Sequence, residues 1–367
     1  MSKVFLFPIL VLSFLTSACR SGLEVHDLAL NENNIDQIEN LATFGKSYDN
    51  CFYSSRLDST LTTRLINGQT EYLLANKNQE NQNIEVWDLE AQKIIQTINE
   101  TNSNTILFHP DQRKIISFFA NETGQLTLWD IQSGQPQQSF ILDTSRLYDD
   151  RYISISRDGL KIALFTVHDY GVDFRITEFN LQTNQITNLD YEFPLYYETP
   201  PPYLYTPTGT LIAVTYGFDE KLHLLDLTNQ KDMVLEFPFT KLIDAVMTEA
   251  IISTITVSSN EKYLAGSALN GDIYLWDVTN GALLRSFEAH TTQRTDGWVG
   301  GVKILEFSPD SNLLVSVGHD SFTRLWDANA GVLLKEINTC HHFGRFTQYG
   351  RYLVTVGKMG IELWGIP

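Results

Sequence analysis

A short strand-like segment built around Trp-Asp returns along the whole chain at intervals of roughly 40 to 50 residues. Five copies keep the Trp, and two degenerate copies place Phe179 and Leu225 there instead. The Trp copies lie at residues 84–89, 126–131, 273–278, 323–327 and 361–364, and the degenerate ones at 175–180 and 222–227. A period of this length indicates repeated units that bury their apolar faces against one another. The pattern therefore leaves few folds other than a repeat architecture.

The residues around each copy repeat as well. Residues 307–310 read Phe-Ser-Pro-Asp, and they are followed by the apolar run 313–317, the Trp segment and a final apolar run at 331–335. Related turn sequences stand at residues 108–111, 156–159 and 205–209. Pro fixes φ in such turns, and Asp or Gly tolerates their geometry. Each unit therefore reads as four short strands joined by turns, which predicts an all-β chain.

These motifs together resemble the WD-repeat family, and the resemblance spans nearly all of the chain from Ile35 to Pro367. The resemblance implies a single domain at residues 35–367, folded as a seven-bladed β-propeller of four-stranded antiparallel blades. An unrelated all-β sandwich is the alternative that the strand pattern leaves open.

The two ends of the repeat series predict how the ring closes. The last copy ends three residues after Trp364, so its blade lacks an outermost strand and would have an unpaired edge. Residues 41–44 resemble the outer strands of other repeats, such as residues 284–287. We therefore expect an N-terminal strand to complete the last blade, and loss of residues 35–44 to destabilise the whole ring.

The first residues carry the pattern of an export signal. An apolar run at residues 4–15 follows Lys3 and is short for a bilayer span, so residues 1–18 are predicted to be a signal peptide. Residues 15–19, Leu-Thr-Ser-Ala-Cys, resemble the bacterial lipobox, which implies lipidation of Cys19 and a membrane-anchored, extracytoplasmic protein of the cell envelope. Residues 19–34 are expected to form a tether. Simple cleavage and secretion is the alternative.

Charge and cysteine content add two further expectations. The chain has 26 Lys and Arg against 44 Asp and Glu, a net charge of -18, which argues against nucleic acid or an anionic membrane surface as a partner. Besides Cys19, only Cys51 and Cys340 remain. In an oxidising compartment such a pair is a disulfide candidate. Two buried free thiols are the alternative.

One repeat contains a set of side chains that the WD-repeat resemblance implies to be structural. His290, Ser316, Asp320 and Trp326 stand where the family links residues by hydrogen bonds that make a blade rigid. The set also resembles a Ser-His-Asp catalytic triad, but the blade context favours the structural role. His341 and His342 could meet His290 at a metal, although a solvated loop is the simpler interpretation. We predict no catalytic residue, metal or cofactor.

Two loops depart most from the repeat and are the predicted binding surface. Both join an outer strand to the next blade, which places them on one face, and binding residues concentrate on loops held by a rigid scaffold. The candidates are Tyr196, Tyr197 and Tyr203 in the first loop, and Arg294 and Trp298 in the second. The sequence thus favours a non-catalytic scaffold that binds an envelope protein or peptide. The alternative is an extracytoplasmic hydrolase or small-ligand binder with its site in the central channel.

Overall fold

The structure is a computed structural model of the 367-residue chain. It describes residues 29–45, 59–66, 69–78, 80–100, 102–103, 105–119, 124–141, 153–168, 173–189, 201–217, 219, 221–238, 251–291, 301–338 and 340–366. The predicted signal peptide and several predicted site residues lie outside this part, namely Cys19, Cys51, Tyr196, Tyr197, Arg294 and Trp298. Among the residues that are described, no helix is long and apolar enough to cross a bilayer.

The described strands form seven four-stranded antiparallel sheets, one for each sequence repeat. Blade 1 consists of β2 (Ser59–Ile66), β3 (Gln69–Lys77), β4 (Ile84–Asp88) and β5 (Lys93–Ile98). Blade 2 consists of β6 (Thr105–Phe108), β7 (Lys114–Phe119), β8 (Gln125–Asp130) and β9 (Pro136–Ile141). Blade 3 consists of β10 (Ile153–Ile155), β11 (Lys161–His168), β12 (Asp173–Asn180) and β13 (Gln185–Leu189). Blade 4 consists of β14 (Tyr203–Tyr205), β15 (Leu211–Tyr216), β16 (Leu222–Asp226) and β17 (Lys231–Leu235). Blade 5 consists of β18 (Ile252–Val257), β19 (Tyr263–Ala268), β20 (Asp272–Asp277) and β21 (Leu283–Glu288). Blade 6 consists of β22 (Val302–Phe307), β23 (Leu313–Gly318), β24 (Phe322–Asp327) and β25 (Val332–Asn338), and blade 7 of β26 (His341–Phe346), β27 (Leu353–Gly357), β28 (Gly360–Gly365) and β1 (Glu39–Phe44).

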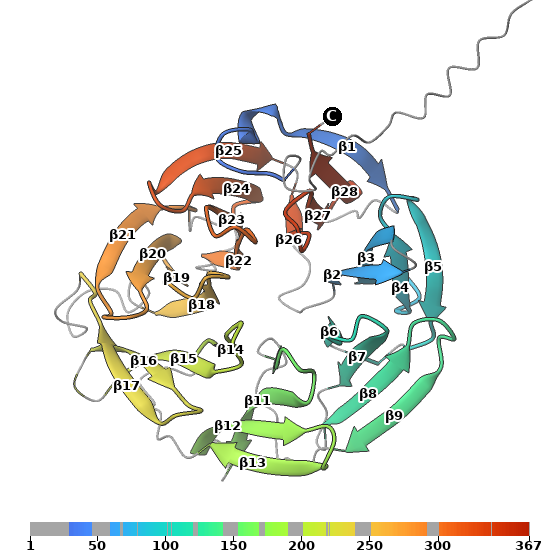
Figure 1. The fold of residues 1–367 in the computed structure, drawn as a ribbon, viewed down its shortest axis with the longest axis horizontal. Coiled ribbons are helices and arrows are strands. Elements are labelled where there is room, and N and C mark those ends of the chain that lie inside the picture. Colours follow the sequence, from blue (N-terminus) through green and yellow to red (C-terminus); the bar gives the residue numbers. More distant parts are fainter. Residues whose placement is uncertain are drawn as a thin grey trace, which may run out of the picture.

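The sheets stand around a central axis as the blades of a β-propeller (Figure 1). The predicted fold class is therefore confirmed, including the two blades in which Phe179 and Leu225 replace Trp.

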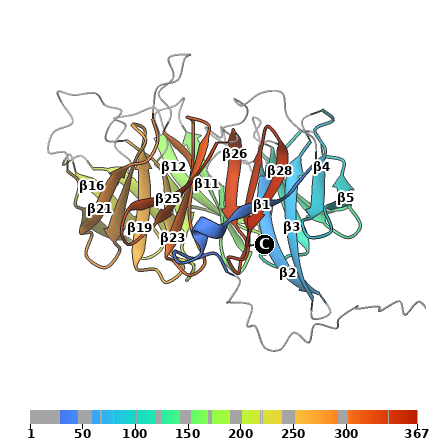
Figure 2. The same ribbon diagram turned by 90° about the horizontal axis from the view of Figure 1, so that it is seen from above.

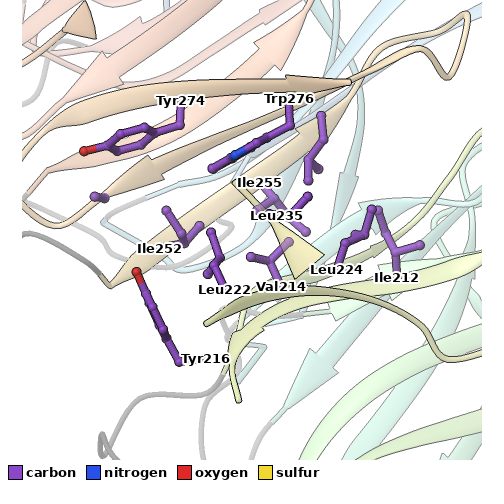
Figure 3. Packing of buried hydrophobic residues seen from close by; sticks show 12 residues of the cluster. Ile212, Val214, Tyr216, Leu222, Leu224, Leu235, Ile252, Ile255, Tyr274 and Trp276 are labelled. Carbon is purple, nitrogen blue, oxygen red and sulfur yellow. The ribbon is translucent and has the colours of Figure 1, made fainter. Parts of the chain in front are cut away.

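The hydrophobic core lies between the blades, since both faces of each sheet are apolar. At the junction of blades 4 and 5, Val214, Leu222 and Leu224 pack against Ile252 and Trp276 (Figure 3), and Trp276 is fully buried. Burying a side chain of this size contributes about 1.5–3 kcal/mol. Each blade thus depends on both of its neighbours for burial.

The ring is closed by β1, which pairs antiparallel with β28. The pairing runs from Glu39 opposite Gly365 to Phe44 opposite Ile361, with one irregularity after Asn40. Asn40 also donates a side-chain hydrogen bond to Glu362 at 2.9 Å. The predicted N-terminal closing strand is confirmed, and it begins two residues earlier than the segment recognised in the sequence.

The segment before β1 is part of the folded domain. Leu30, Ile35 and Ile38 are 1–2% exposed and join the core between blades 6 and 7, while Ile35–Gln37 form a short 3-10 helix, η2. The predicted tether extended to residue 34, but the folded chain already includes Leu30. Sequence pattern did not indicate this because single apolar residues in a polar segment carry no strand or helix period.

The turns divide the ring into two faces. The strand ends that the first-to-second and third-to-fourth turns join lie on one face of the ring, which we call the turn face. The opposite strand ends lie on the other face, which we call the loop face (Figure 2). The first turns keep the predicted chemistry, with positive φ at Gly159, Ser311 and Gly350. Neighbouring turns also touch, since His109 Nε2 lies 3.0 Å from the carbonyl oxygen of Gly159.

Candidate functional site

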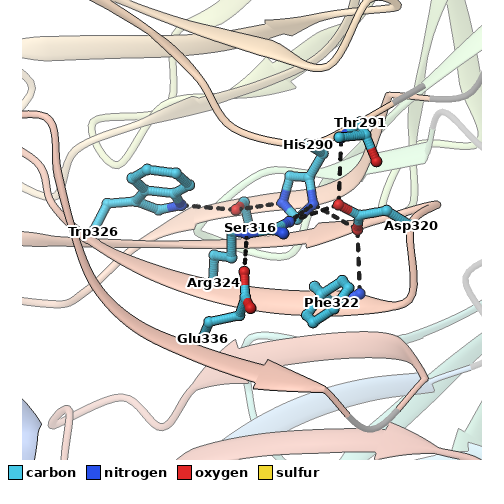
Figure 4. A network of polar contacts seen from close by, with 8 residues as sticks. All are labelled: His290, Thr291, Ser316, Asp320, Phe322, Arg324, Trp326 and Glu336. Carbon is cyan, nitrogen blue, oxygen red and sulfur yellow. Dashed lines mark hydrogen bonds and ion pairs between the residues drawn. The ribbon is translucent and has the colours of Figure 1, made fainter. Parts of the chain in front are cut away.

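The four residues predicted to stabilise a blade meet on the loop-face side of blade 6 (Figure 4). Trp326 Nε1 donates to Ser316 Oγ at 2.9 Å. Ser316 Oγ lies 2.7 Å from His290 Nε2, and His290 Nδ1 lies 2.8 Å from Asp320. The His290 side chain is fully buried, and that of Asp320 is 6% exposed. The structure therefore brings all four side chains into one continuous chain of hydrogen bonds.

The hydrogen-bond inventory fixes the direction of this chain. Ser316 Oγ accepts the indole proton, so its own proton is free to go to Nε2 of His290. Nε2 is then the acceptor, and Nδ1 carries the ring proton and donates it to Asp320. In the other tautomer, with the ring proton on Nε2, the Ser316 hydroxyl proton would have no acceptor among these four side chains. With a neutral imidazole that carries its proton on Nδ1, each of the four side chains therefore has a hydrogen-bond partner.

A cation that the sequence analysis missed completes the network. Arg324 Nη1 donates to Asp320 at 2.7 Å, and Arg324 Nε donates to Glu336 at 2.8 Å. Nη1 also lies 2.6 Å from His290 Nδ1. Both of these nitrogens are donors, so we interpret their proximity as convergence on Asp320 rather than a hydrogen bond between them. Asp320 thus links the partly buried Arg324 to the fully buried His290.

Burial and charge set the protonation states here. Burial lowers the pKa of His290 below its ordinary value, and Asp320 only partly offsets this effect. Burial would by itself raise the pKa of Asp320, but the hydrogen bonds and charges of His290 and Arg324 outweigh it and hold that pKa well below its usual range. A neutral imidazole beside an ionised carboxylate is therefore the stable state at neutral pH.

The turn between β23 and β24 in blade 6 also fixes the chain on either side of it. The backbone N–H of Thr291 donates to Asp320 Oδ2 at 3.3 Å, and the N–H of His319 donates to the carbonyl oxygen of Gly301 at 3.1 Å. The N–H of Cys340 donates to the carbonyl oxygen of Ser321 at 3.1 Å. Residues 291 and 301 are the two ends of the loop that contains Arg294 and Trp298. Both ends of that loop are therefore held by the same turn.

Blade 4 has a related arrangement that the sequence analysis also missed. His223 is buried, and its Nε2 and Nδ1 lie 2.8 Å from Asp219 and 2.7 Å from Asp232. Gly217 precedes Asp219 as Gly318 precedes Asp320, and a Cβ at either glycine would collide with the histidine ring. The shared spacing, Gly-x-Asp followed four residues later by a basic side chain, is the signal that could have found both sites.

The pKa of His223 gives a stability prediction of defined sign. Burial lowers this pKa, but the hydrogen bonds that His223 donates to Asp232 and Asp219, together with their negative charges, outweigh burial and raise it above the ordinary value. The stabilisation from His223 is thus complete below about pH 6.5, the unfolded pKa, and is lost as pH rises through the folded pKa. We expect His223→Gln to cost roughly 0.5–1 kcal/mol at pH 5.5 and less at pH 8.5, measured by urea unfolding.

The matched variant for this experiment is His290→Gln. Because the folded pKa of His290 is lowered, the stabilisation from His290 is present above about pH 6.5 and is lost as pH falls. The free energy of unfolding lost in His290→Gln should therefore be larger at pH 8.5 than at pH 5.5, the reverse of His223→Gln. A loss for His223→Gln that stays constant or grows toward pH 8.5 would contradict the assignment of a charged His223.

Blades 2 and 7 contain the first link of this hydrogen-bond chain, from the Trp to a Ser or Thr, and blades 1 and 5 lack it among the described residues. Trp129 donates to Ser117 at 2.8 Å, and Trp364 donates to Thr355 at 2.9 Å. Trp276 donates to the carbonyl oxygen of Glu236, and the Nε1 of Trp87 is buried without a partner among the described residues. Blade 6 is thus the blade in which the described residues extend this link to a His and an Asp.

Two other predicted sites can be placed. Tyr203 was predicted to bind a partner, but it is 6% exposed in β14, packs in the core between blades 3 and 4, and directs its hydroxyl to the carbonyl oxygen of Ala163 at 3.4 Å. That prediction is wrong for Tyr203, because the strand places its ring between blades. Cys340 is disulfide-bonded. Both other cysteines lie outside the described residues, so the pairing with Cys51 stays a prediction.

Within the described residues, no group of three or more His, Cys, Asp or Glu side chains is placed to hold a metal ion. The side chains of His341 and His342 lie outside the part of the structure that is described.

The network lies within the part of the chain that matches a known family. The family described as "WD domain, G-beta repeat" matches residues 281–327, which contain all four predicted residues, His290, Ser316, Asp320 and Trp326. The chain is a seven-bladed β-propeller, and residues 281–327 of it match this family.

Characterised proteins that are similar in sequence match parts of this propeller. Protein ROOT INITIATION DEFECTIVE 3 of Arabidopsis thaliana is 36% identical over 75 residues, 20% of this chain and 15% of the relative. DDB1- and CUL4-associated factor 4 of Homo sapiens is 27% identical over 89 residues, 24% and 17% of the two chains. Nuclear distribution protein PAC1 of Saccharomyces cerevisiae is 22% identical over 195 residues, which are 52% of this chain and 34% of PAC1. The chain thus spans 15–34% of the lengths of these relatives.

Proposed function

We propose that this WD-repeat propeller is a lipid-anchored, extracytoplasmic scaffold of the bacterial envelope that binds a protein or peptide on its loop face and performs no catalysis. The observation that carries the proposal is the fixation of residues 291 and 301 by one turn, the one between β23 and β24. A rigid base of this kind presents the intervening loop, with Arg294 and Trp298, in a defined place.

The chemistry of that loop suits protein recognition. Arg and Trp are enriched among the residues that dominate binding energy at protein interfaces. The first predicted loop, with Tyr196 and Tyr197, connects blades 3 and 4 and therefore belongs to the same face by topology. The name of one similar protein, DDB1- and CUL4-associated factor 4, describes it as associated with two other proteins, which also supports a binding role.

The proposed location is supported by sequence chemistry and by the disulfide. The lipobox-like residues 15–19 place a lipid acceptor at Cys19. Disulfides form and persist mainly outside the reducing cytosol, and Cys340 is bonded. A partner available to the protein there would be another envelope protein or peptide.

The test is affinity capture of the tagged full-length protein from detergent-extracted membranes, with bound proteins identified by mass spectrometry. We expect Trp298→Ala combined with Tyr197→Ala to abolish capture of the partner, while the circular dichroism spectrum and melting temperature stay unchanged. The matched control is Tyr349→Ala, because Tyr349 is an aromatic residue that is 42% exposed on the turn face. Capture that survives in the loop variant would remove the binding role from this face.

A further inference from the structure

The described chain begins at a defined point on the turn face. The N–H of Leu30 donates to the carbonyl oxygen of Gly350 at 2.7 Å, in the first turn of blade 7. The carbonyl oxygen of Ala29 accepts hydrogen bonds from the side chains of Asn31 and Asn34, at 3.1 and 2.9 Å. A Cβ at Gly350 would lie 3.6 Å from Pro309 in the first turn of blade 6 and 3.8 Å from Ala29. The N-terminal segment therefore enters the propeller between these two turns.

This entry point is fixed by burial. Leu30 is 1% exposed and packs with Ile35 and Ile38 against the core of blades 6 and 7, which includes Leu313 and Leu353. In Figure 2, the blue segment that precedes β1 lies toward the lower, turn-face side of the ring. Moving the entry point to the other face would expose these apolar side chains to water, which is unfavourable.

The proposed lipid site lies only a short length of chain away. Nine residues, 20 to 28, separate Cys19 from Ala29. A chain of this length spans at most about 35 Å when fully extended and about 18 Å as a flexible coil. The strands of a blade are about 20 Å long from one face to the other. A tether of average length, about 18 Å, is therefore shorter than the blade is high, so the loop face would not reach the bilayer.

We propose that the turn face of blades 6 and 7 rests at the lipid headgroups and that the loop face points away from the membrane. The inference rests on the proposed lipidation of Cys19 and deepens the proposed function, because it leaves the partner-binding loops accessible. Tyr349 supports this orientation. It is 42% exposed in the same turn as Gly350, and aromatic rings with a polar group favour the headgroup region.

The two ends of one strand provide a matched test. Tyr349 precedes β27 on the turn face, Met359 follows it on the loop face, and they are 42% and 53% exposed. Each is replaced in turn by p-acetylphenylalanine and labelled with a donor fluorophore, which spares the cysteines. Energy transfer is then measured from the lipidated full-length protein to acceptor-labelled lipid in vesicles of phosphatidylethanolamine and phosphatidylglycerol. We expect transfer at 349 to be at least about twofold more efficient than at 359, because the strand separates them by about 20 Å. Equal or reversed efficiencies would overturn the orientation.

Two controls separate this inference from the proposed anchor. Cys19→Ala should abolish association with the vesicles. If the wild-type protein itself carries no lipid and does not float with vesicles, the anchor fails and the orientation fails with it. If the protein is lipidated and bound but shows equal transfer, the orientation alone fails. A flexible 30-residue Gly-Ser insertion between residues 28 and 29 should remove the difference, and a difference that persists would contradict control by the tether.

Discussion

A chain that lacks residues 35–44 should lose most of its folding stability and melt at least about 10 °C lower than the full domain. The deletion removes β1, which forms the outer strand of blade 7, together with Ile35 and Ile38, which are 2% exposed. Each buried aliphatic side chain contributes about 1.5–3 kcal/mol, and the total stability of a typical domain is only about 5–15 kcal/mol. Circular dichroism melting of the purified protein is the measurement.

The matched control for this deletion is a chain that begins at Ala29. It keeps every contact that Leu30, η2 and β1 make, so its melting temperature should equal that of the longer chain. The milder variant Ile38→Ala should cost about 2–4 kcal/mol, which keeps the test informative if the deletion does not fold. A deletion that melts within 2 °C of the control would show that blade 7 is stable without its fourth strand.

Asp320→Ala should destabilise the propeller by about 3–5 kcal/mol. Asp320 accepts hydrogen bonds from His290 Nδ1, Arg324 Nη1 and the N–H of Phe322, and its side chain is 6% exposed. Its removal leaves the buried His290 and the partly buried, charged Arg324 without their common acceptor. Urea unfolding at pH 7 measures this loss.

Glu336→Ala is the control, because it removes the other carboxylate from the same Arg324. Glu336 is 41% exposed, so this change should cost at most about 1 kcal/mol. The pKa of Asp320 is lowered, so its contribution is present above about pH 3.8, the unfolded value, and is lost as pH falls through the folded value. Equal losses for Asp320→Ala and Glu336→Ala would contradict the central role assigned to Asp320.

The sequence predicted the features that depend on local, repeated pattern. The Trp-Asp segments, the first turns and the alternating strands recur in register, so the blade count and even the closing strand could be predicted. The set of His290, Ser316, Asp320 and Trp326 was found because family resemblance supplies its spacing.

Features that depend on packing between distant segments could not be predicted in this way. Tyr203 stands in an aromatic, proline-rich segment that suggested an exposed loop, and only the neighbouring blade makes it buried. Arg324 and His223 project from strands whose pattern indicates only strand structure, and their carboxylate partners come from turns and outer strands. Such cross-strand charge pairing leaves no strand-period signal in the sequence, and only the Gly-x-Asp spacing before the basic residue marks it.

The pairing of β1 with β28 also determines the order in which the molecule can be completed. Asn40 and Glu362, which bond across this pair, are separated by 322 residues. At a synthesis rate of about 5–20 residues per second, β1 would wait for tens of seconds before its partner exists. During that time the newly made chain has an unpaired edge that other strands could bind. A product that stops before Gly360 never acquires β28, so ring closure distinguishes complete chains from truncated ones.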